Sequence, residues 1–140
     1  MKLFYFLVFL SPWIYASVAA QDHVTVGGEC EYERFECKAK ITSITQRPSL
    51  RNTDHTSYEV KFTVFSISLP LGEKAGIEGR EFLLLLNNST YPGPRYLKKY
   101  DISVGKIFNC YYHAITRGTC TPAIFDFPDI KLDDYFENQP

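Results

Sequence analysis

Apolar and polar residues alternate along several stretches of this chain, as they do in β-strands that have one buried and one solvated face. A first strand is predicted over residues 35–45, and the break in its phase at Ile44 indicates a bulge or a strong bend. A second strand is predicted over residues 58–69, where the apolar residues change face midway along the run. Such a change of face is typical of a long strand that serves both sides of a small barrel.

The middle of the chain continues the β pattern with different signals. Residues 80–87 contain an uninterrupted FLLLL run, which predicts a third strand with both faces covered. Loops are predicted over residues 46–57, which are polar, and residues 70–79, which contain Gly and Pro. A short helix is predicted over residues 95–100, because Pro94 suits the position just before a helix start.

A β-hairpin is predicted towards the end of the chain. Its strands cover residues 107–116 and 119–127, and both are rich in aromatic and β-branched residues. The turn is predicted at Arg117-Gly118, because glycine tolerates a positive φ there. A turn centred on this dipeptide places Thr116 opposite Thr119.

Residues 1–20 are predicted to be a secretory signal peptide, because Lys2 precedes an apolar run and small residues surround Ala20. The apolar run is short and interrupted by Pro12, so no membrane span is expected after cleavage; an uncleaved anchor is the alternative. Cleavage would leave a flexible lead-in, a β-barrel domain and an acidic tail, over residues 21–34, 35–127 and 128–140.

The charge of the chain limits the classes of partner. The formal net charge is −1, and loss of Lys2 with the signal peptide leaves about −2. This balance argues against nucleic-acid binding that relies on overall charge. A secreted or periplasmic location is expected. The tail over residues 128–140 is expected to be either disordered or a short acidic helix, and its carboxylates lack the spacing of a calcium loop, so no metal or cofactor is predicted.

Four cysteines in an exported chain are expected to form two disulfides. In the predicted hairpin Cys110 lies near Phe125 and not opposite Cys120. Each of these two cysteines is therefore expected to bond one of the early pair, Cys30 and Cys37, in a connectivity that stays open. Early-to-late pairing also closes long loops, each worth about 4 kcal/mol. Neither pair has the C-x-x-C spacing of zinc or thioredoxin-like sites.

Five strands with the longest connection between the third and the fourth predict an all-β domain with one short helix. The predicted architecture is a five-stranded, OB-like Greek-key barrel stapled by disulfides. Such a barrel places its first strand beside the fourth, which would bring Cys37 towards Cys110. The alternative is an Ig-like β-sandwich, which would need about seven strands.

The segments CKAKI, YEVKFTV, VGKIFNC and GTCTP carry a resemblance that covers roughly residues 35–127. Their layout resembles small exported OB-like proteins and is more distantly similar to the netrin-like domains of metalloprotease inhibitors. The resemblance implies an OB-like barrel. Those inhibitors chelate the protease zinc through a cysteine at the mature N-terminus, whereas cleavage here would expose Gln21 and leave Cys30 as the tenth residue. The resemblance therefore implies no inhibitory site in this chain.

Three residues on one face of the predicted strand over residues 107–116 are candidates for ligand binding: Asn109, Tyr111 and His113. OB-like barrels often bind ligands through aromatic residues on a strand face. No catalytic residue is predicted, because the sequence identifies no carboxylate that would orient His113 as a base. Asn87 and Asn88 both fit the N-glycosylation acceptor pattern, which matters only in a eukaryotic source.

These features favour a secreted, non-enzymatic binding module whose partner is a protein or a glycan. A small secreted hydrolase or thiol-redox protein is one alternative, motivated by His113 and the cysteines. An accessory subunit of a cell-envelope complex is another.

Overall fold

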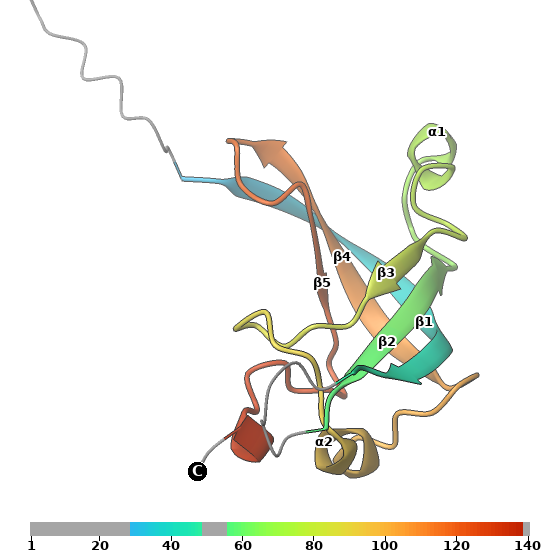
Figure 1. Cartoon of the computed structure of the whole chain (residues 1–140). Coiled ribbons are helices and arrows are strands. Elements are labelled where there is room, and N and C mark those ends of the chain that lie inside the picture. Colours follow the sequence, from blue (N-terminus) through green and yellow to red (C-terminus); the bar gives the residue numbers. More distant parts are fainter. Residues whose placement is uncertain (1–28, 49–55, 139–140) are drawn as a thin grey trace, which may run out of the picture.

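The computed structural model describes residues 29–48 and 56–138. The predicted signal peptide and the first part of the predicted lead-in, residues 1–28, lie outside the described residues. The described part contains one antiparallel five-stranded sheet in the order β3-β2-β1-β4-β5, which curls into a half-barrel (Figure 1). The strands are β1 (Glu31–Gln46), β2 (Tyr58–Phe65), β3 (Glu81–Leu83), β4 (Ile107–Arg117) and β5 (Ala123–Asp126). The predicted all-β, barrel-like fold is confirmed, and it is one curled sheet rather than two packed ones.

The long strand β1 is the centre of the sheet, with β2 on one side and β4 on the other. The prediction that the first and fourth strands are adjacent is therefore confirmed. The register of β1 against β2 shifts between Ile41 and Ser43, which confirms the bulge predicted close to Ile44. β1 begins at Glu31, earlier than residue 35, because its first residues also pair with the end of β4.

The predicted register of the β4–β5 hairpin is wrong by two residues. Tyr112, not Cys110, faces Phe125. The connection is also longer than a two-residue turn, because β5 begins only at Ala123. Two features account for the longer connection. Cys120 is bonded to Cys30 instead of continuing the strand, and Pro122 has no N–H to offer the ladder.

The other element boundaries differ locally from the prediction. β2 ends at Phe65 because Ser66 has a φ of 51°, which breaks the extended backbone. The predicted third strand over residues 80–87 is reduced to the three residues of β3. The predicted loop over residues 70–79 contains a short helix, α1 (Leu71–Lys74), so the described residues contain two short α-helices where one was predicted.

The second helix, α2 (Pro94–Lys99), confirms the predicted helix and lies at one end of the half-barrel (Figure 1). The acidic tail packs beside it as far as the 3₁₀ turn η1 (Phe136–Asn138), and Ile130 of the tail is buried in the core. Within the described residues, no helix is long and apolar enough to cross a membrane.

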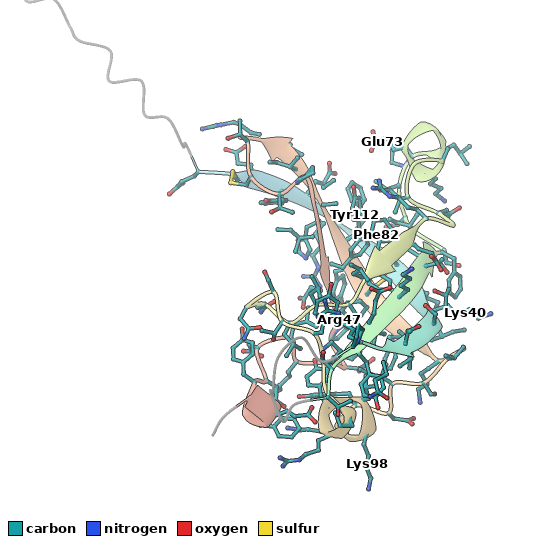
Figure 2. All side chains as sticks on the ribbon, in the orientation of Figure 1. Lys40, Arg47, Glu73, Phe82, Lys98 and Tyr112 are labelled. Carbon is teal, nitrogen blue, oxygen red and sulfur yellow. A yellow bond between two sulfur atoms is a disulfide. The ribbon has the colours of Figure 1, made fainter. Side chains whose placement is uncertain are left out.

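The core lies on the inner face of the curl. Phe62 is 1 % exposed, and its ring centroid lies 5.3–5.7 Å from the rings of Phe82, Phe125 and Phe127. Figure 2 shows Phe82 and Tyr112 pointing into the curl, while Lys40 points away from it. Local alternation in the sequence therefore identified which face of the strands is buried.

Two disulfides tie the first strand to the last hairpin: Cys30–Cys120 and Cys37–Cys110. The predicted early-to-late pairing is confirmed, including the proximity of Cys37 to Cys110, which face one another across β1 and β4. Disulfides persist in oxidising compartments, so both bonds indicate an extracytoplasmic environment.

Candidate functional site

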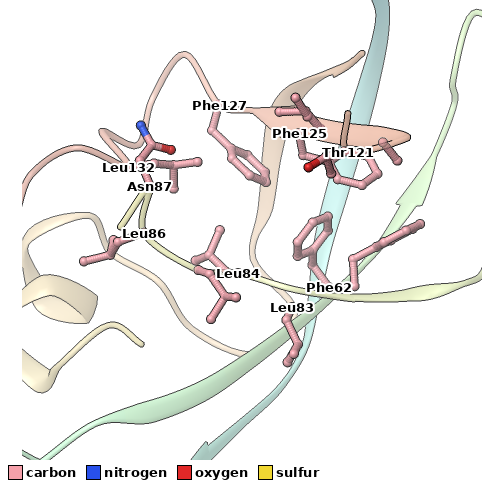
Figure 3. A pocket seen from close by; sticks show the side chains of 13 residues that line it. Phe62, Leu83, Leu84, Leu86, Asn87, Thr121, Phe125, Phe127 and Leu132 are labelled. Atoms are coloured by element: carbon pink, nitrogen blue, oxygen red, sulfur yellow. The ribbon is translucent and has the colours of Figure 1, made fainter. Parts of the chain in front are cut away.

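The half-barrel is not closed by hydrogen bonds, because β3 and β5 are the two edge strands of the described sheet. They approach one another through side chains on the inner face, where the ring centroids of Phe82 and Phe125 lie 4.6 Å apart. Figure 3 shows the groove that remains between the two edges, with residues 82–87 on one wall and residues 121–127 on the other. We call this feature the seam groove.

The seam groove has a volume of about 350 Å³ and mostly apolar walls. Leu83 is 43 % exposed and Ile124 is 42 % exposed, so both edges present large apolar side chains to solvent. Asn87 and Thr121 are the polar residues on the walls. A concave apolar surface with a few polar groups is the usual form of a binding site.

A second hollow of about 350 Å³ continues the seam groove onto the outer face of β4 and β5. The two hollows share four lining residues: Asn87, Ile124, Phe125 and Leu132. The second hollow adds Tyr32, His113 and Asp126. We call this part the polar end of the seam groove. The predicted ligand residue His113 therefore lies beside the seam, although no pattern in the sequence predicted a groove there.

Asn109 and Tyr111 lie apart from His113, next to a third hollow of about 380 Å³ on the outer face. The guanidinium carbon of Arg34 sits 3.5 Å from the centre of the Tyr111 ring, so one face of this ring is already covered. The amide oxygen of Asn109 accepts a hydrogen bond from Lys38 Nζ at 3.3 Å. The three predicted ligand residues share one strand face, but they border two different hollows.

Among the described residues, side chains that could take part in acid–base, metal or thiol chemistry are His113, the carboxylates and the cysteines. His113 makes no hydrogen bond or ion pair with a carboxylate in the described structure, so nothing there orients it as a base. Residues 29–48 and 56–138 contain no group of three or more His, Cys, Asp or Glu side chains that could hold a metal ion. All four cysteines are in disulfides. No thiol is left in the described chain to act as a nucleophile.

Electrostatic contacts and hydrogen bonds hold the tail against α2. The carboxylate of Asp134 accepts hydrogen bonds from Lys99 Nζ and the Tyr100 hydroxyl, each at 2.5 Å. The Lys99 hydrogen bond lowers the pKa of Asp134, and the same bond raises the pKa of Lys99. Burial raises the pKa of Tyr96, whose hydroxyl donates to the Lys131 carbonyl at 2.8 Å. These contacts are structural, since they attach the tail to the helix.

The two predicted glycosylation acceptors are both exposed. The Asn88 side-chain oxygen accepts hydrogen bonds from the backbone N–H and the hydroxyl of Thr90. Asn87 lies on the rim of the seam groove. Use of either acceptor stays a prediction.

Sequence reasoning missed the seam groove. The FLLLL run was interpreted as a strand covered on both faces, whereas Leu83 lies at an open edge. The signal that could have found the groove is the combination of two apolar strands, β3 and β5, that have no predicted neighbour beyond them.

No protein family model, curated protein or solved structure matches this chain. The resemblance to small OB-like and netrin-like domains therefore stays a prediction from the layout of the sequence.

Proposed function

We propose that this protein is an exported, non-enzymatic, OB-like binding module that holds a protein ligand in its seam groove. The observation that carries the proposal is the pair of open sheet edges with an apolar groove of about 350 Å³ between them. An exposed apolar surface that is concave and rimmed by polar residues is typical of an interaction site.

Export is supported by the two disulfides and by the signal-peptide pattern at residues 1–20. The OB-like assignment is supported by the five-stranded order with β1 beside β4 and by a helix in the connection between β3 and β4. The role of an accessory subunit in a cell-envelope complex is compatible with such a module, because a subunit also needs one surface for a protein partner.

A protein ligand is favoured over a glycan by the chemistry of the two hollows. Sugar rings need polar side chains and an open aromatic face, and Arg34 covers one face of the candidate platform Tyr111. The seam groove instead exposes Leu83 and Ile124, whose aliphatic side chains suit apolar side chains of a protein.

The site is tested by photo-crosslinking in the natively exported protein. A photoreactive amino acid is placed at Leu83, and in a matched control at Lys40, which is exposed on the central strand β1, away from both edges of the sheet. We expect one crosslinked protein from position 83 and none from position 40. Ile124→Glu should abolish that crosslink while the circular dichroism spectrum stays unchanged. Crosslinking from position 40 alone would place the binding surface on the outer face and contradict the proposal.

A further inference from the structure

We propose that the occupant of the seam groove is an extended peptide segment of a partner protein, which adds as a strand to the free edge of β5 and places a basic residue beside Asp126. This inference rests on the proposed function, because it specifies how the same groove takes its protein ligand. It is carried by the backbone groups of the two edges and by the distribution of charge along them.

The hydrogen-bond phase of β5 follows from one hydrogen bond just before the strand. The Ile115 N–H donates to the Pro122 carbonyl at 3.2 Å. Bonded and non-bonded pairs alternate along an antiparallel ladder, so Ile124 and Asp126 also bond β4. Ala123 and Phe125 then direct their N–H and C=O groups away from β4, towards the seam.

The phase of the β4–β5 ladder leaves these four backbone groups of Ala123 and Phe125 out, and outside the ladder no hydrogen bond between described residues uses them. Unpaired backbone groups beside apolar side chains are costly unless water or a strand satisfies them. They form the regular row of donors and acceptors to which an extended peptide adds.

Bonded and non-bonded pairs also alternate along the facing edge, β3. The Leu84 N–H donates to the Val60 carbonyl at 2.9 Å, so the facing pair Phe62–Phe82 is a bonded pair. The backbone groups of Glu81 and Leu83 therefore point away from β2. An occupant of the seam thus meets backbone groups on both of its sides and apolar side chains beneath it, which calls for apolar residues at alternate positions.

The charges distinguish the two edges. Glu81, on β3, accepts a hydrogen bond from the Thr42 hydroxyl at 3.1 Å and lies 4.0 Å from Lys61 Nζ. Asp126, on β5, is exposed, and its carboxylate accepts only the Phe127 N–H within the described part of the chain. No described cation pairs with it. A lysine or arginine of the partner would complement this charge, whereas a second copy of the chain would bring another Asp126.

The test uses three synthetic peptides and the whole exported chain. The first peptide alternates valine and threonine and carries a lysine at one flank. The second replaces the lysine by glutamate, and the third is the lysine peptide with N-methylated backbone amides. Amide hydrogen exchange measured by NMR reports the pairing of Ala123 and Phe125 directly, and titration gives the affinities.

We expect the lysine peptide to slow exchange of the Ala123 and Phe125 amides about tenfold or more, and the N-methylated peptide to have no effect. The glutamate peptide should bind about threefold more weakly at low salt, and Asp126→Lys should reverse that preference. Ala123→Pro should weaken binding about tenfold, because it removes an N–H that β4 does not use. Ala123→Val keeps the N–H and should bind like the wild type.

Several outcomes overturn the inference. Binding without protection of Ala123 and Phe125 contradicts strand addition and leaves the proposed function intact if the crosslink from Leu83 persists. Failure of all three peptides, together with protection that grows with protein concentration, assigns the edge to a second copy. If the Ala123 and Phe125 amides are already fully protected in the dilute free chain, a segment of the same chain covers the edge of β5. If Ala123→Pro does not fold, an unchanged peptide preference in Asp126→Lys refutes the charge pairing.

Discussion

The two disulfides are nested, so the stability that each contributes depends on whether the other is present. Cys30–Cys120 joins residues 90 apart and encloses Cys37–Cys110, which joins residues 73 apart. Between the two bonds lie only short arms, 7 residues from Cys30 to Cys37 and 10 residues from Cys110 to Cys120. With one bond in place, the other closes a loop of roughly 17 residues instead of a long one.

The chain-entropy model gives the magnitudes. Closing the 73-residue loop alone is worth about 4.4 kcal/mol, and adding the second bond to it is worth about 3 kcal/mol. Removing either bond from the native protein should therefore cost about 3 kcal/mol of unfolding free energy. Removing both should cost about 7.5 kcal/mol, more than twice the loss from either one.

The assay is urea unfolding followed by circular dichroism, on Cys30→Ser/Cys120→Ser and on Cys37→Ala/Cys110→Ala. The second pair should lose about 1 kcal/mol more than the first, because Cys37 and Cys110 are buried and the substitution also removes packing. The chain with all four cysteines reduced should be close to unfolded, since small domains have about 5–15 kcal/mol of stability in total. Equal losses for one bond and for both would refute the nested-loop reasoning.

Three further predictions concern the contacts between α2 and the tail. Tyr96→Phe should cost about 1–3 kcal/mol in thermal unfolding, because it leaves a backbone carbonyl of the tail unpaired; an unchanged midpoint would contradict this. Since its pKa is lowered in the fold, Asp134 stabilises above about pH 4, and this contribution is lost as the pH falls below that value; urea titrations of Asp134→Asn should lack that acid-side loss. A Cβ at Gly93 would lie 2.4 Å from the Glu137 carboxyl carbon, and that carboxylate caps the first turn of α2. Gly93→Ala should therefore cost about 1 kcal/mol in the wild type and much less in Glu137→Ala, whereas equal costs in both backgrounds would show that the contact is unimportant.

The sequence predicts the faces of the strands well, because alternation is a local property. Val60, Phe62 and Val64 recur at every second position, and all three are buried. The early-to-late pairing of the cysteines could also be predicted, because β1 and β4 are neighbours in a five-stranded barrel; the connectivity itself was left open.

The register of the hairpin and the burial of the FLLLL segment could not be predicted from the sequence, because residues far away along the chain determine them. The hairpin register depends on the bond of Cys120 to Cys30, which lies 90 residues away in the sequence. Whether Leu83 is covered depends on whether another strand pairs with the outer edge of β3, and the FLLLL run itself contains no information about such a neighbour. For the same reason the run was predicted to be buried although it forms a wall of the groove.

The tail shows the same limit. Its acidic composition led to the prediction of disorder or a short acidic helix. Instead, Glu137 accepts hydrogen bonds from the backbone of α2, from residues 41 and 42 positions earlier in the chain. The composition of a segment indicates how soluble it is, whereas the part of the chain against which it packs depends on the tertiary fold.

The most direct test of the seam groove as the binding site is hydrogen exchange of the exported protein, alone and in complex with the protein crosslinked from Leu83. The account predicts that the complex protects residues 82–87 and 121–127, the two walls of the groove, and leaves the outer face at Lys38 and Asn109 unchanged. Protection confined to the outer face, with both walls exchanging as in the free protein, would contradict it.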